Sequence, residues 1–377
     1  MQETGTWCET TDSERHFTVQ SIHDMMKSMA FVAAAMSLAS RQLDHVERRQ
    51  RPVTLELYQY TIQLLLRQPP VKSDASMLAA CTLLCVYEMM ASEVHEWRRH
   101  LKGCAGHLQA KRWNGSTEGI VKGCFWAFAR IADVWAAFVS GKTTLIPTDF
   151  WIDDMSIESV AAKGNLDDYC NLTNLIFAEI VNLRAAGCHE NGATSVWSLW
   201  NELQTWYRLR PQDVCPLLRD HSSPGKVFPT ILYSRSSSIC GNTFYHTGCI
   251  LLLQTGVLPV ATGGTALFKE TKSAIWHARE LTGISMSNPS HANWVNQLQP
   301  LFIAGTAFAS SALETWEPEE NMPLARSSGA TPNVAEVEDL YAAEKILLLK
   351  HLTRIERESG WKTSDRAATL RGLWGLE

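Results

Sequence analysis

The stretch SMLAACTLLCVYEMM (Ser76–Met90) is apolar on every side of a helix, interrupted only by one threonine, one tyrosine and one glutamate. A second run, IVKGCFWAFARIADVWAAFVS (Ile120–Ser140), is followed by Gly141, the residue type that most often ends a helix in a left-handed conformation. A helix that is apolar all round has to be buried on all sides. The two segments therefore predict a pair of core helices at the centre of an all-α protein.

Length and composition allow a large core. The chain has 377 residues, of which 45% are hydrophobic and 19% charged, and this predicts either two or three domains or one large helical body. The formal net charge of −5 argues against direct binding to nucleic acid, because phosphate contacts require a concentrated basic surface.

The ten cysteines follow no disulfide or metal-binding pattern. No two are spaced as C-x-x-C, and several fall on apolar helix faces, which predicts buried free thiols in a reducing compartment. The first seventeen residues, MQETGTWCETTDSERHF, are polar and acidic, unlike a signal or transit peptide. We find no uninterrupted apolar run of the ~18 residues that a membrane span requires. The sequence therefore predicts a soluble intracellular protein with no membrane partner.

Helical periodicity recurs along the rest of the chain, and almost no alternating β pattern is present. Residues 1–16 are predicted to be a disordered tail, and 17–377 a single domain of about a dozen helices. The stretch 212–229 contains three prolines and no periodicity, which predicts an internal loop and a boundary between two lobes. A further loop is expected at Trp316–Asn333. Besides the central pair, helices are predicted at Phe17–Leu43, Thr54–Gln68, Asn165–Arg184, Ser195–Pro211, Ser236–Thr255, Ala266–Thr282, His291–Ser310 and Ala335–Ser359.

Several segments resemble the large regulatory region of fungal zinc-cluster transcription factors. Four lie near the centre: CTLLCVYEMM (Cys81–Met90), WRRHLKGC (Trp97–Cys104), FWAFARIADVWAAF (Phe125–Phe138) and TLIPTDFW (Thr144–Trp151). Four more follow in the order that family members show: FPTILY (Phe228–Tyr233), GNTFYHTGCILLLQ (Gly241–Gln254), LQPLFIAG (Leu298–Gly305) and IERESGW (Ile355–Trp361). The resemblance covers residues 17–377 and implies an all-helical regulatory domain.

Members of that family carry a zinc cluster before the regulatory region. It consists of two C-x-x-C-x6-C halves, whose six thiolates hold two zinc ions beside a basic recognition helix. Before Phe17 this sequence contains only Cys8 and no basic run. Because distant single cysteines cannot supply that thiolate geometry, we expect no DNA-reading head here. The alternative is a zinc cluster encoded by an upstream exon.

Three patterns that suggest catalysis or metal binding fail on spacing. The two histidines of HEWRRH (His95–His100) are five residues apart, whereas a zinc-protease helix needs them four apart. SGKTT (Ser140–Thr144) lacks the first glycine of a phosphate loop, and Asp167 and Asp168 lack the second acid of a magnesium site. The sequence therefore assigns no catalytic, cofactor-binding or metal-binding residue.

Three polar residues in apolar helices remain as candidates. Arg130 and Asp133 are three residues apart, so an α-helix would place them on one face as an internal ion pair. His246 and Cys249 have the same spacing, which suits two metal ligands, although we expect a core histidine beside a buried thiol. The alternative role of Arg130, Asp133 and His246 is the polar floor of a ligand cavity.

The resemblance implies a nuclear regulator of transcription for a fungal, secondary-metabolite gene set. Without its own zinc cluster, the protein would act through contacts with the transcriptional machinery or with a DNA-binding regulator, and it would need no cofactor. The alternative is a helical scaffold repurposed as an enzyme, for instance a cyclase or isomerase, with a small hydrophobic ligand in the cytoplasm.

Overall fold

The part of the chain that the structure describes is mainly helical, as the sequence predicts. The computed structural model describes residues 3–20, 23, 26–67, 74–91, 94–187, 192–220, 225–258, 272–309 and 339–376, and only the backbone of 94–100. Within these ranges it contains fourteen α-helices and one two-stranded antiparallel ribbon. The all-α prediction is confirmed. The loop predicted at Trp316–Asn333 lies outside the described residues.

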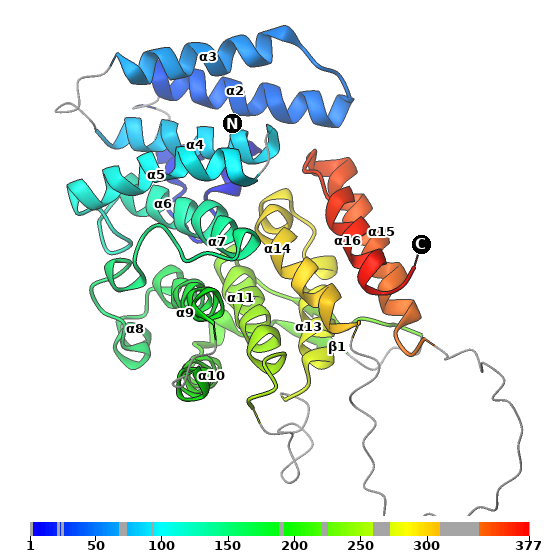
Figure 1. Cartoon of the computed structure of the whole chain (residues 1–377). Helices are drawn as coiled ribbons and strands as arrows, with labels where there is room; N and C mark the ends of the chain where they lie inside the picture. Colours follow the sequence, from blue (N-terminus) through cyan, green and yellow to red (C-terminus); the bar gives the residue numbers. More distant parts are fainter. Residues whose placement is uncertain are drawn as a thin grey trace, which may run out of the picture.

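Four helices form one end of the molecule (Figure 1). The first, α2, begins at Met29 and not at Phe17, because the Ser28 hydroxyl caps it by accepting a hydrogen bond from the Phe31 N–H at 3.3 Å. The next helix, α3, begins at Pro52, two residues before the predicted start at Thr54, and forms a hairpin with α2 above α4. The bounds are α2 Met29–Glu47, α3 Pro52–Leu66, α4 Ala75–Ala91 and α5 Val94–Lys111.

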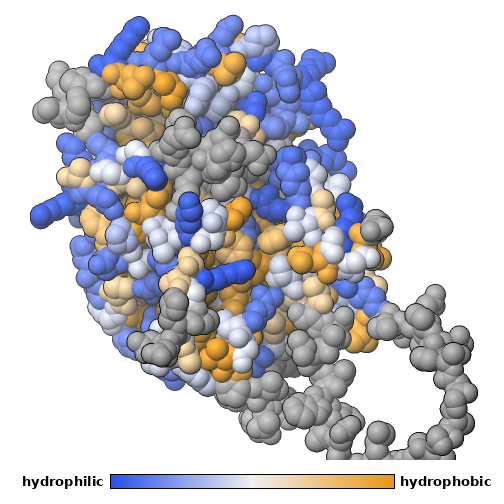
Figure 2. Space-filling model, viewed as in Figure 1, coloured by the Kyte–Doolittle hydropathy of each residue, from blue (hydrophilic) through white to orange (hydrophobic). Residues whose placement is uncertain are grey.

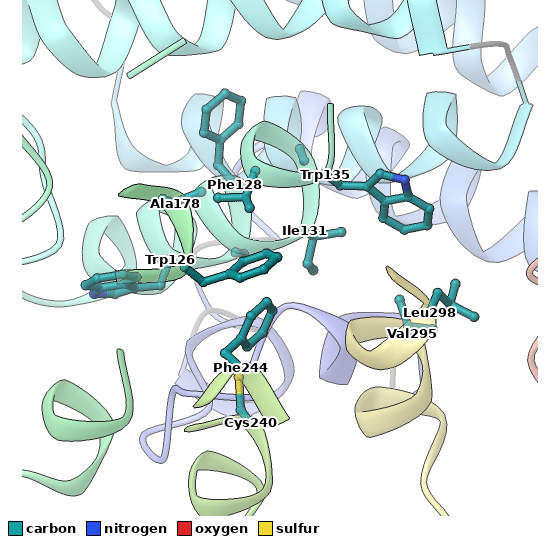
Figure 3. Packing of buried hydrophobic residues seen from close by; sticks show 14 of the residues in the cluster. Trp126, Phe128, Ile131, Trp135, Ala178, Cys240, Phe244, Val295 and Leu298 are labelled. Carbon is teal, nitrogen blue, oxygen red and sulfur yellow. The ribbon is translucent and has the colours of Figure 1, made fainter. Parts of the chain in front are cut away.

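The central segment predicted as one helix is divided by a π turn. It runs as α6 (Ile120–Ala127), a π-helical turn (Phe128–Asp133) and α7 (Val134–Ser140), which ends at Gly141 with a φ of 63°. In length and composition the whole segment could cross a membrane, but 83% of its apolar window is buried inside the fold, as in a core helix. Its side chains pack against α9, α11 and α14 (Figure 3).

Helix α11 (Ser236–Leu253) is buried over its whole length from Ser237 to Leu252. Two glycines allow neighbouring helices to approach it closely. A Cβ added at Gly248 would lie 3.0 Å from side-chain atoms of Ile180 and Leu203, and one at Gly241 would lie 3.1 Å from Cys170 and Trp206. The centre of the fold is therefore α11 together with the predicted central pair. The helices beside it are α8 Ile157–Lys163, α9 Leu166–Ala186 and α10 Gly192–Arg208.

The remaining elements close the other side of the molecule (Figure 1). Residues 212–229 are not wholly irregular, because they contain a 3-10 turn (Gln212–Val214) and strand β1 (Leu218–Asp220). Strand β1 pairs antiparallel with β2 (Thr230–Leu232). The division into two lobes at this point stays a prediction. The last helices are α13 Ala274–Ser287, α14 His291–Ala307, α15 Ala342–Ser359 and α16 Ser364–Leu373.

The N-terminal segment is folded, so the prediction of a disordered tail over residues 1–16 is wrong for its described part, 3–16. A 3-10 turn (Thr4–Trp7) packs on α14, and the side chains of Trp7 and Phe17 are fully buried. The sequence is polar there because its hydroxyl and carboxylate groups form hydrogen bonds to distant residues. Local composition contains no sign of those partners.

Candidate functional site

Arg130 lies in the π turn and binds the N-terminal segment. Its guanidinium donates from Nε to the Asn296 Oδ1 at 2.7 Å, and from Nη1 to the Thr11 Oγ1 at 2.8 Å. Burial lowers the pKa of Arg130, while the nearby Cys240, Cys8, Asp12 and Asp167 oppose that shift. The side chain is 4% exposed, so this cation is held by polar groups inside the fold.

Asp133 is satisfied elsewhere, and the predicted ion pair between Arg130 and Asp133 is wrong. The fully buried Asp133 carboxylate accepts the backbone N–H groups of Leu145 and Ile146 at 2.7 and 3.0 Å. The reason is the π turn: its i→i+5 hydrogen bonds put more residues in each turn, so positions three apart no longer share a face. Asp133 therefore fixes the chain that follows α7.

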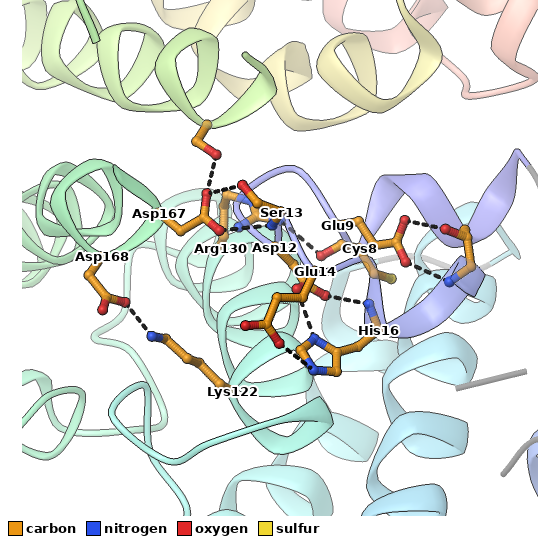
Figure 4. A network of polar contacts seen from close by, with 12 residues as sticks. Cys8, Glu9, Asp12, Ser13, Glu14, His16, Lys122, Arg130, Asp167 and Asp168 are labelled. Atoms are coloured by element: carbon orange, nitrogen blue, oxygen red, sulfur yellow. Dashed lines mark hydrogen bonds and ion pairs between the residues drawn. The ribbon is translucent and has the colours of Figure 1, made fainter. Parts of the chain in front are cut away.

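A polar network joins the N-terminal segment to three helices (Figure 4). Asn296 on α14 donates through Nδ2 to the Trp7 carbonyl at 3.1 Å and to the Thr10 hydroxyl at 2.7 Å. Asp167, at the start of α9, accepts from the Ser13 N–H and hydroxyl at 2.8 and 2.9 Å, and from the Ser237 hydroxyl on α11. Asp167 is therefore part of this network, and the structure assigns it a positioning role.

His246 pairs with another histidine. Its Nδ1 lies 2.8 Å from the Nδ1 of His277 on α13, so one ring donates and the other accepts. Burial, followed by the neighbouring His277, lowers the pKa of His246 well below its usual value. Cys249 receives a weak hydrogen bond from Gln204 at 3.7 Å. In the described part of the chain, no three His, Cys, Asp or Glu side chains are gathered as metal ligands would be.

The cysteines are free thiols in apolar surroundings, as the sequence predicts. Seven of the nine described cysteines are buried, and Cys85 and Cys104 approach to 3.7 Å between sulfur atoms. Burial raises the pKa of Cys8 to about 12 and the pKa of Cys124 well above its ordinary value. Thiols with raised pKa values are poor nucleophiles at neutral pH, which favours a packing role.

The three candidate residues do not converge on one site. Arg130, Asp133 and His246 have different hydrogen-bond partners, drawn from different parts of the fold. Sequence reasoning missed Asn296 and His277, which have no local signal and become recognisable only when α13 and α14 pack. Trp7 did offer a signal, because a lone tryptophan in an acidic segment suggests burial.

Because His351 is buried, we expect the protein to lose stability as the pH falls from 6.5 to about 4. Burial lowers its pKa from 6.5 to about 4, and its Nε2 lies 2.8 Å from the Ser285 hydroxyl. Because the unfolded state binds the proton at higher pH, this contribution is complete above pH 6.5 and is lost as the pH falls to about 4. The loss is on the order of 3 kcal/mol. Denaturant unfolding across this range should show a smaller pH slope for His351→Gln, and an unchanged slope would contradict the burial of this ring.

One helix face is apolar and exposed. Along α2, Met29, Met36 and Leu43 recur every seven residues and are 60%, 53% and 50% exposed. Figure 2 shows a hydrophobic patch at the upper left, over the end of the hairpin where α2 begins and α3 ends. With the residues between them, these side chains form what we call the α2 seam: Met29, Val32, Met36, Ala39, Leu43 and Val46.

Comparison with known proteins agrees with this helical architecture. Residues 12–318 match the fungal-specific transcription factor domain. The transcription activator AMTR1 of Alternaria alternata is 22% identical over 375 residues, and the match covers 81% of this chain and 44% of that relative. The chain thus spans less than half the length of that relative. No solved structure matches the chain. Because the family match includes most of the chain, this protein belongs to the family that carries the fungal-specific transcription factor domain.

Proposed function

We propose that this protein regulates the transcription of a fungal metabolic gene set, in the nucleus, through contacts with other proteins. Family membership and the similarity to a transcription activator of Alternaria alternata support a regulatory role. The buried polar groups agree with this role. Arg130 and Asp133, the candidates for the polar floor of an enzyme cavity, bind other parts of the fold instead. The observation that carries the protein-contact mechanism is the α2 seam.

The seam has the spacing of a helix-pairing surface. Its residues alternate three and four apart, which is the a/d pattern of a heptad repeat. The opposite face of α2 is already packed, since Phe31 and Leu38 are fully buried against the core. Helix α2 therefore has two apolar faces. One packs against the core, and the other, the α2 seam, is not needed for that packing.

The seam's chemistry favours an amphipathic helix of another protein as the partner. Large apolar side chains at heptad spacing bury best against a second helix with the same repeat. Exposed methionines adapt their shape to such a surface. The proposed partner is therefore a helix of the transcriptional machinery or of a DNA-binding regulator, docked along α2.

Charged substitutions in the seam test this mechanism. Met36→Glu combined with Leu43→Glu should leave the midpoint of thermal unfolding nearly unchanged, because both side chains are half exposed. Placed in a docked interface, the two carboxylates would be desolvated without partners. In cells that carry only this variant, transcripts that depend on the protein should fall to the level seen without it.

The matched control changes exposed leucines elsewhere, at Leu217 and Leu373, which are 72% and 52% exposed. Leu217→Glu combined with Leu373→Glu adds the same charge and should leave transcripts at the wild-type level. Normal transcripts in the seam variant, or equal losses in both variants, would show that the α2 seam is not the contact surface.

A further inference from the structure

A basic groove lies where the end of α2 meets α15 and α16. Gly360 ends α15 with a φ of 79°, and α2 approaches so closely that a Cβ there would lie 3.1 Å from the His45 Cβ and 3.2 Å from the Gln42 carbonyl. The groove beside this contact has a volume of about 640 Å³. In Figure 2 the surface near the end of α2, at the upper right, is largely hydrophilic.

The groove carries a surplus of positive charge. Its lining includes six cationic side chains and two carboxylates, those of Asp44 and Glu356. Both carboxylates have partners: Asp44 binds Arg51 at 2.9 Å and the Thr54 hydroxyl at 2.6 Å. Glu356 accepts the N–H groups of Thr363 and Ser364, which start α16. The six cations are Arg41, Arg48, Arg49, Arg357, Lys362 and Arg371.

Several of these cations have no counter-charge among the residues that the structure describes. Arg357 pairs with the partly exposed Glu358, and Lys362 pairs with the exposed Asp365. For Arg48, Arg49 and Arg371, no carboxylate of the described residues lies within ion-pair distance. Like charges gathered in a concave site focus a field that attracts anions.

Two buried nitrogen atoms in the lining are without hydrogen-bond partners. They are the Nε of Arg41, which is a donor, and the Nε2 of His45. Burial lowers the pKa of His45, and its neutral ring is bonded to the Met90 backbone through the other nitrogen, so Nε2 is an acceptor and only the Arg41 Nε can donate to an anion. The Arg41 guanidinium is held 5.5 Å from the Tyr87 ring centroid, and that ring stacks on Tyr58. A buried donor without a partner destabilises the protein, so an anionic group that accepted a hydrogen bond from the Arg41 Nε would bind more tightly for doing so.

We propose that this groove binds a small organic anion that carries two or more phosphate or carboxylate groups. Arginine forks match both groups in a bidentate way. The volume suits a metabolite-sized ligand, and Arg41, whose Nε–H has no partner, belongs to the lining of the groove. A nucleic acid duplex fits less well, because the chain as a whole is negative.

Titration of the purified protein tests the proposal with defined anions. Inositol hexakisphosphate and pyrophosphate represent the phosphates, and citrate represents the carboxylates, each at constant ionic strength in a calorimeter. At least one should bind saturably with a dissociation constant below about 1 mM. Which one binds distinguishes the two classes of ligand.

Variants locate the binding. Arg48→Gln combined with Arg49→Gln changes exposed side chains, so the protein should fold, and the dissociation constant should rise at least tenfold. Arg41→Gln should have a similar effect. The charge-matched control, Lys142→Gln combined with Arg235→Gln, removes two exposed cations far along the chain and should leave binding unchanged.

Three results would overturn the proposal. The first is the failure of all three anions to bind saturably. The second is an equal loss of binding in the Arg48/Arg49 variant and in the Lys142/Arg235 control, which would indicate unspecific charge attraction. The third is binding of a glutamate decapeptide or a DNA duplex more tightly than any of the three small anions, which would identify a macromolecular ligand.

Discussion

Replacing Trp7 with alanine is expected to lower the free energy of unfolding by about 3–5 kcal/mol, because the change leaves a large cavity. The side chain is fully buried, and its ring lies edge-on to that of Trp361, with 5.7 Å between centroids. Trp361 in turn stacks on Trp135, in α7, at 5.9 Å. The N-terminal segment is thereby joined to the central helix through three rings. Denaturant unfolding followed by circular dichroism measures the loss.

Trp197 supplies the matched control, since its side chain is 38% exposed. Trp197→Ala should cost less than about 1 kcal/mol. A loss of less than about 1 kcal/mol for Trp7→Ala as well would contradict the close packing of Trp7 against the core.

Replacing Asp133 with alanine is expected to lower the free energy of unfolding of the intact protein by about 3–5 kcal/mol. The same denaturant unfolding experiment measures this loss. The loss arises because the N–H groups of Leu145 and Ile146 would lose their acceptor. Asp133→Asn should cost less, since its remaining carbonyl oxygen can still accept one of the two hydrogen bonds.

A double-mutant cycle that combines Asp133→Ala with Arg130→Met tests whether these two side chains form an ion pair. Arg130 donates to Asn296 and Thr11, so its loss and that of Asp133 should be nearly additive. We expect a coupling energy below about 1 kcal/mol. Recovery of most of the lost stability in the double mutant would show that the two charges do pair.

The helices could be predicted wherever their signals are local. Helix α3 begins at Pro52, two residues before the predicted start, and α9 begins directly after Asn165, the first residue of the predicted helix, which caps it through its side chain. Gly141 ends α7, as the sequence indicates. The burial of Ile120–Ser140 followed from its all-round apolar pattern. These features depend on residues within a few positions of one another, which is why composition and spacing are sufficient to find them.

The site chemistry could not be predicted in the same way. Arg130 was expected to pair three residues along its own helix, yet its partner Asn296 is 166 residues away. The π turn that rotates Asp133 away carries no strong sequence mark, and Asn296 contacts the Trp7 carbonyl 289 residues distant. Likewise, the cations of the basic groove come from α2 and from α15 and α16. Because these helices are far apart in the sequence, the sequence alone does not show that their cations lie together.

The regulatory role is tested most directly by deleting the gene and measuring transcripts and metabolites in the same cultures. The account predicts that a set of metabolic transcripts falls, and that re-expression of the intact chain restores it. The Met36→Glu and Leu43→Glu variant should not restore it. Transcripts that remain at the wild-type level after deletion, while one pathway intermediate accumulates, would contradict the regulator and identify an enzyme.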